Sequence, residues 1–205
     1  MGQAQRMPWR QRRLEIKEDD FKSTAYSSIT YGEKQRVYDP IMKTSVQSTK
    51  EIPKESLKHL SDHLKLAKQC VGSYRTGKEA KRLVYITPIL IVVCSLFYAA
   101  DGVKLSFEED PIGINVRATA HFEFVIQRGD KRIFIVEVKK YDMDKGLAQL
   151  LIGCEVASDV EKNHVVLGIV TTLSDWTFLR SCDDKIQINE VTLPSRDNMF
   201  APESL

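Results

Sequence analysis

The first regular pattern along the chain is a set of apolar residues spaced three and four apart after residue 53. They are Leu57, Leu60, Leu64, Ala67 and Val71. This spacing places them on one face of an amphipathic helix. A second helix is predicted over residues 77–85. Thr87 and Pro88 have the composition of a helix start, a capping hydroxyl followed by a first-turn proline, so a third, buried helix is predicted from Pro88 to about Tyr98.

From residue 103 onward the pattern becomes that of short strands around one further helix. Strands are predicted at residues 103–107, 112–116, 120–126, 132–139, 165–170, 176–179 and 186–191, and a helix at residues 144–158. Alternation in the third strand puts Phe122, Phe124 and Ile126 on one face and Glu123 on the other. We therefore predict an α/β fold, a mixed central sheet flanked by helices. Strand 120–126 should run antiparallel to 132–139, and strand 165–170 should join the same sheet.

Composition supports one domain with extensions. The chain has 205 residues, 42% of them hydrophobic, and a net charge of +2. Residues 1–52 lack hydrophobic periodicity and are predicted to form a weakly ordered basic and polar extension. Residues 53–193 are predicted to form the α/β domain, and residues 194–205 a C-terminal tail.

Cysteine usage and hydropathy bear on the compartment. The four cysteines are scattered and form no CxxC pair, as in reduced thiols of an intracellular protein, cytoplasmic or nuclear. Residues 1–20 contain no apolar segment typical of a secretory signal. The longest apolar run, 84–100, is shorter than the ~20 residues that span a bilayer, so we expect a buried helix and no membrane partner.

Candidate chemistry lies in the apolar stretch RIFIVEVK at residues 132–139. Glu137 and Lys139 stand two apart, so they project from the same face of a strand where charge is costly unless it is paired or binds a metal. If residues 129–131 form a three-residue loop, Glu123 lies opposite Glu137. Two facing carboxylates repel unless a cation such as Mg²⁺, or Mn²⁺, lies between them. A two-residue loop would put them on opposite faces.

A second interpretation of the same stretch is purely structural. Glu137 and Lys139 would then lie on an exposed edge strand and pair with each other across its surface. Spacing alone does not separate this interpretation from a metal site.

A first acid, a hairpin, then E-x-K followed by a helix resembles the core of the PD-(D/E)XK nuclease-like superfamily. Here Glu123 stands where the superfamily usually has aspartate. Gln149, in the helix after the motif, and Glu79, before the apolar helix, match further site positions of that superfamily. The resemblance implies a restriction-endonuclease-like αβββαβ core. More narrowly, residues 78–193 resemble the C-terminal domains of Crinkler-type proteins.

The resemblance implies a metal-dependent nuclease that acts on DNA or RNA. Its candidate catalytic residues are Glu123, Glu137, Lys139 and Gln149, and its candidate metal ligands are Glu79, Glu123 and Glu137. It also allows a homodimer, since nucleases of this superfamily often dimerise. Two alternatives stay open: a catalytically degraded nucleic-acid- or chromatin-binding module, and a host-directed effector interaction domain on the same fold.

Overall fold

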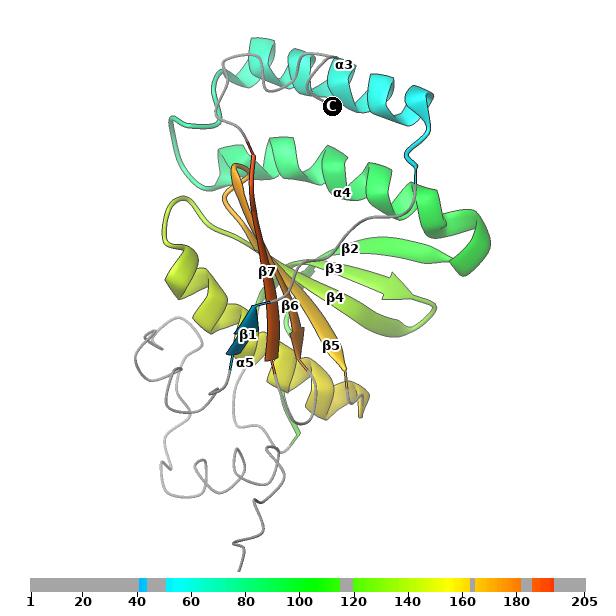
Figure 1. Cartoon of the computed structure of the whole chain (residues 1–205), viewed down its shortest axis with the longest axis vertical. Coiled ribbons are helices and arrows are strands. Elements are labelled where there is room, and N and C mark those ends of the chain that lie inside the picture. Colours follow the sequence, from blue (N-terminus) through cyan, green and yellow to red (C-terminus); the bar gives the residue numbers. More distant parts are fainter. Residues whose placement is uncertain (1–40, 44–50, 115–119, 163–164, 182–185, 194–205) are drawn as a thin grey trace, which may run out of the picture.

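The computed structural model describes residues 41–43, 51–114, 120–162, 165–181 and 186–193. The helices and strands in this part of the chain are β1 (Ile41–Lys43), α3 (Lys54–Val71), α4 (Ala80–Asp101), β2 (Val103–Glu109), β3 (Phe122–Arg128), β4 (Lys131–Val138), α5 (Met143–Glu161), β5 (Val166–Thr171), β6 (Asp175–Ser181) and β7 (Ile186–Thr192). The strands form one sheet in the order β1-β7-β6-β5-β4-β3-β2 (Figure 1). The prediction of a mixed α/β fold with helices on a central sheet is confirmed.

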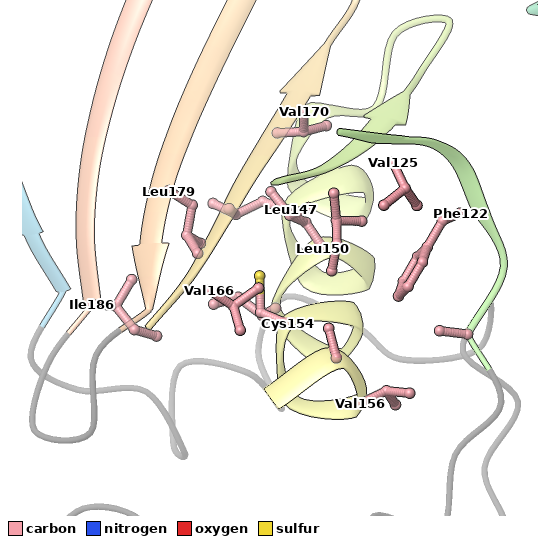
Figure 2. Close-up of a cluster of buried hydrophobic side chains, with 14 of the residues drawn as sticks. Phe122, Val125, Leu147, Leu150, Cys154, Val156, Val166, Val170, Leu179 and Ile186 are labelled. Carbon is pink, nitrogen blue, oxygen red and sulfur yellow. The ribbon is translucent and has the colours of Figure 1, made fainter. Parts of the chain in front are cut away.

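The sheet is mixed because β4 runs antiparallel to β3 and parallel to β5, as predicted. Helix α5 connects β4 to β5 and packs on one face of the sheet, where Leu150 and Val170 are fully buried (Figure 2). Helix α4 covers the other face, against Phe124 and Val136, and α3 lies on α4 (Figure 1). Strand β4 is therefore apolar on both faces, and the charged pair at its end stands out from this pattern.

Helix α4 is continuous where two helices were predicted. It runs through Thr87 and Pro88, which do not form a helix start. Proline interrupts a helix by removing one backbone donor and crowding the preceding turn. The carbonyl that Pro88 leaves without its helical donor is that of Val84, and the Thr87 hydroxyl donates to the carbonyl one residue before it, that of Leu83, at 2.6 Å. The helix ends at Gly102, which adopts a left-handed conformation with φ 63°.

Helix α4 is also less buried than its apolar sequence predicts. Its 22 residues are long and apolar enough to cross a membrane by length and composition, and only 28% of its most apolar window is buried in the fold. Ile91 and Tyr98 are more than half exposed. An apolar groove of 460 Å³ lies between this part of α4 and β2. Because soluble core helices pass the same test, length and hydropathy alone carry no membrane assignment.

The β3–β4 hairpin combines a two-residue loop with the inner register expected of a three-residue loop. Only Gly129 and Asp130 lie between the strands, so of the two loop lengths that the sequence left open the two-residue loop is observed. An irregularity between Ile126 and Gln127 shifts the pairing by one residue. Phe124 therefore pairs with Val136, and this is the register that a three-residue loop would have produced.

Two of the predicted segments lie partly outside the described residues. Ile41–Lys43, inside the segment predicted to be a weakly ordered extension, pairs as a parallel strand with β7. The remainder of residues 1–50 and the tail from residue 194 lie outside the described part. Of the strand predicted at 112–116, Ile112 forms an isolated bridge and residues 113 and 114 are not in a strand, while 115 and 116 are not described.

Candidate functional site at the end of strand β4

Glu137 and Lys139 form a buried ion pair where β4 ends. Glu137 is 3% exposed, and its Oε1 lies 2.5 Å from the Nζ of Lys139. Val136 and Val138 point to the α4 face, so Glu137 points to the α5 face, as does Ile135. The predicted common face of Glu137 and Lys139 is thus realised as a direct contact. The strand is not an edge strand, since β3 and β5 flank it, which removes the exposed-edge interpretation.

A glycine on α5 makes room for the lysine. A Cβ at Gly146 would lie 2.7 Å from Cγ of Lys139 and 2.5 Å from Cγ2 of Val170. Both distances are below van der Waals contact, so only glycine lets the lysine stem pass between α5 and β5 as it does. The ammonium is thereby directed back towards Glu137.

Glu123 lies where the pairing of β3 becomes irregular. Its Oε2 accepts a hydrogen bond from the backbone N–H of Val138, so a side chain replaces a strand partner at this point. On the neighbouring strand β2, Glu108 adopts a left-handed φ of 47° and is missing from the pairing of β2 with β3. The irregularity also explains a departure from the predicted alternation, because Phe122 packs with Val125 on the α5 face and not with Phe124.

Glu79 and Gln149 reach the same end of the sheet from two helices. Glu79 precedes α4, and its Oε2 accepts from the backbone N–H of Lys140 at 2.8 Å. Gln149 is 6% exposed and stands three residues after Gly146, on the side of α5 that meets β4. Its Oε1 is buried without a hydrogen-bond partner. An amide oxygen left in this state costs free energy unless something binds it.

Burial governs the ionisation of the two central carboxyls. It raises the pKa of Glu123 to about 8, with a further upward contribution from Glu137. Burial likewise raises the pKa of Glu137, and the Lys139 ammonium offsets part of that effect. For Lys139, burial acts to lower the pKa, but attraction to Glu137 and their hydrogen bond outweigh it and raise the pKa. At neutral pH Lys139 is charged and Glu123 is largely protonated.

Two buried oxygens at this site are available to a cation. Oε2 of Glu137 and Oε1 of Gln149 have no hydrogen-bond partner. Oxygen ligands of this kind are those that Mg²⁺ prefers, so the chemical type of these two donors suits such an ion. Within the described part of the chain, however, no group of three His, Cys, Asp or Glu side chains is arranged to hold a metal. Glu79 and Glu123 are instead directed at backbone N–H groups.

The sequence did not single out two residues beside the site. Arg82 is 3% exposed although arginine is usually a surface residue, and its Nε donates to the Thr172 carbonyl at 3.2 Å. Tyr141, directly after Lys140, is 69% exposed. The available signal was an aromatic residue next to two lysines, immediately after the E-x-K stretch.

The chain is similar to a known effector protein over most of its length. Over 197 residues, 96% of this chain, it is 36% identical to Crinkler effector protein 5 of Phytophthora infestans. The chain is Crinkler-like. It spans 55% of the length of that protein, about half. No protein-family model matches the chain, and no solved structure matches it. The resemblance to Crinkler-type proteins is confirmed over more of the chain than residues 78–193, whereas the wider nuclease superfamily stays a prediction.

Proposed function

We propose that this Crinkler-like domain is a Mg²⁺-dependent phosphodiesterase that cleaves DNA or RNA, with a PD-(D/E)XK-type site. The observation that carries the proposal is the buried pair at the end of β4, where Glu137 keeps one oxygen on Lys139 and the other without a partner. A buried carboxylate on a central strand lowers the stability of the fold when one of its oxygens has no hydrogen-bond partner. Binding a cation during function accounts for that cost.

The order of elements supports the same proposal. Helix α4, strands β2, β3 and β4, helix α5 and strand β5 follow one another as in the αβββαβ core of the superfamily. Glu79 precedes that helix, Glu123 lies on the middle strand of the three, and Gln149 lies on the second helix. These are the positions that the superfamily uses for its site.

The residues have distinct roles in this proposal. Glu137 and Glu123 would hold the ion, with Gln149 and Glu79 beside them, and Mn²⁺ would replace Mg²⁺. When bound, such an ion would lower the pKa of a coordinated water and neutralise charge on the phosphate. Lys139 stabilises the negative charge that develops on the phosphate, and Glu137 together with Gly146 holds the lysine in place.

Calorimetric titration with Mg²⁺ and Mn²⁺ tests the metal site without depending on a substrate. We expect saturable binding by the wild-type protein and none by Glu137→Gln. Asp130→Asn is the matched control, because Asp130 is an exposed acid in the turn at the other end of β4. Metal-dependent cleavage of a labelled oligonucleotide should be lost in Glu137→Gln and kept in Asp130→Asn. Equal metal binding by all three proteins would refute the site.

A specific observation favours a second function, a binding or effector interaction domain without catalysis. The acids Glu79 and Glu123 are held by backbone N–H groups, and the relative's name describes an effector. An effector role inside a host cell, in the cytoplasm or nucleus, agrees with the free thiols Cys70, Cys94 and Cys154. Under this alternative the protein binds no metal, and Glu137→Gln leaves partner or nucleic-acid binding unchanged.

A further inference from the structure

An exposed aromatic ring stands beside the site, on the loop between β4 and α5. Tyr141 is 69% exposed and follows Lys139 by two residues. Adjacent Cα atoms are about 3.8 Å apart, so its backbone lies within about 8 Å of that of the candidate catalytic lysine. A tyrosine that served only the core would bury its ring.

Two cations flank this ring. The guanidinium carbon of Arg82 lies 5.4 Å from the ring centroid, and Nζ of Lys140 lies 4.8 Å from it. Both distances are within the range of cation–π attraction. Tyr141 is therefore held in place although most of its surface is open to solvent.

Arg82 is an unusual support because it is almost fully buried. Its Nη1 has no hydrogen-bond partner, and its Nε is bound to a carbonyl, a neutral acceptor. Among the ion pairs of the described residues, none involves Arg82. No carboxylate of the described residues therefore forms an ion pair with the positive charge at the base of the ring. Such a charge contributes to the attraction of an anion at the surface above it.

The loop is also fixed relative to the acids. Glu79 binds the backbone N–H of Lys140, and Asp142 caps α5 by accepting from the N–H of Lys145 at 2.8 Å. Tyr141 lies between these two anchored residues. A preorganised aromatic ring loses little conformational freedom when it binds a flat ligand.

We propose that Tyr141, with Lys140 beside it and Arg82 behind it, is a stacking subsite for an unpaired nucleobase, so that the domain takes single-stranded nucleic acid. The proposal deepens the proposed function and rests on it. Aromatic side chains bind successive bases of single strands by stacking, and nearby lysines bind the phosphates. In a duplex the bases are stacked on each other and offer no free face to the ring.

Fluorescence anisotropy with a labelled oligothymidylate of about 12 nucleotides, in EDTA and low salt, tests the subsite. Without metal, the measured binding of the oligonucleotide does not depend on an ion held by the candidate metal ligands. We expect Tyr141→Ala and Tyr141→Leu to weaken binding roughly 5- to 100-fold, and Tyr141→Phe to bind as the wild type does, since it keeps the ring. The matched control is Tyr98→Ala, which removes another exposed tyrosine, near the C-terminal end of α4. A duplex of the same length should bind more weakly than the single strand.

Each contrary result overturns the subsite. Equal affinity of Tyr141→Leu and the wild type would show that the ring does not stack on bases, and so would equal loss in Tyr98→Ala. Absence of single-strand binding by the wild type would exclude the substrate class. None of these results affects the metal titration of Glu137→Gln, which tests the proposed phosphodiesterase site independently of the stacking subsite. Two non-aromatic variants are included so that misfolding of one, detected by circular dichroism, leaves the other to decide.

Discussion

The protonation of Glu123 yields the sharpest prediction, because burial raises its pKa to about 8. In the unfolded chain the same carboxyl ionises near its ordinary value of 4.5. Between these two values the native state holds a proton that the unfolded state has released. As far as Glu123 determines it, the free energy of unfolding is therefore highest below about pH 4.5 and decreases as the pH rises towards 8.

The magnitude follows from the shift. One pKa unit corresponds to about 1.4 kcal/mol, so at pH 7 the raised pKa costs at most about 3 kcal/mol of unfolding free energy. Coupling to Glu137 and partial exposure reduce this value. Glu123→Gln keeps the shape and an oxygen for the Val138 N–H, and it is neutral at every pH. We expect it to stabilise the protein by about 1 to 3 kcal/mol at pH 7 and to change little at pH 4.

Urea unfolding at several pH values between 4 and 8 measures this difference. The wild type should lose stability with rising pH more steeply than Glu123→Gln, whereas Asp130→Asn should follow the wild type. Saturating Mg²⁺ should flatten the wild-type curve, since metal binding requires the ionised carboxylate and releases its proton. Parallel curves for the wild type and Glu123→Gln would refute both the raised pKa and the burial that causes it.

Three further predictions concern the same end of the sheet. Glu137→Gln leaves Lys139 without its charged partner, and thermal melts should show a loss of stability of about 3 kcal/mol. Lys139→Met should still bind metal in calorimetry but should lose cleavage activity. Gly146→Ala and Gly168→Ala both create contacts below 3 Å, with Lys139 and Val170 in the first and with Leu150 in the second. Each should cost about 1 to 3 kcal/mol in urea unfolding, but only Gly146→Ala should also impair cleavage. Glu123→Asp shortens the side chain; calorimetry should show tighter Mg²⁺ binding, and thermal melts a loss of about 1 kcal/mol from the broken Val138 bond.

Most of the sheet could be predicted from the sequence because its strands have strong patterns. The apolar run at 165–170 and the β-branched stretch at 132–139 became the adjacent parallel strands β5 and β4. Burial on both faces requires apolar residues at every position, and this signal is local. β1 carried no such signal, since three residues are too few for a period and its pairing with β7 depends on residues far along the chain.

Local rules were wrong where tertiary contacts decided the conformation. Pro88 is a favourable first-turn residue, but the helix continues through it, and Tyr85, Ile86 and Leu90 on both sides of the proline pack in one core cluster. The β3–β4 loop has two residues, the length expected to place the carboxylates on opposite faces, but an irregularity within the strands gave the register of a three-residue loop. A bulge of this kind has no reliable sequence signature, so agreement on the register came by a different route from the one predicted.

The sequence predicted which residue types form the candidate site and in what order they follow along the chain. It did not predict their hydrogen-bond partners. The common face of Glu137 and Lys139 follows from strand period alone. That Glu123 caps the N–H of Val138 depends on where the β3–β4 pairing stops. The burial of Arg82 depends on the approach of the β5–β6 turn, which supplies the Thr172 carbonyl. Local sequence patterns do not predict such contacts.

The ion pair and the metal site were treated as competing interpretations of one sequence pattern, yet the structure allows both from the same carboxylate. Glu137 has two oxygens: Oε1 binds Lys139, which neutralises the buried charge, and Oε2 is left without a partner. The pair therefore stabilises the ionised form of Glu137 at a position where burial favours the neutral form. Glu123 has no such partner and keeps its proton to about pH 8. One carboxylate is thus prepared for a cation by its lysine, while the other must lose a proton first. Cation affinity at this end of β4 should depend on the ionisation of Glu123, and a domain built this way binds metal more tightly as pH rises towards 8.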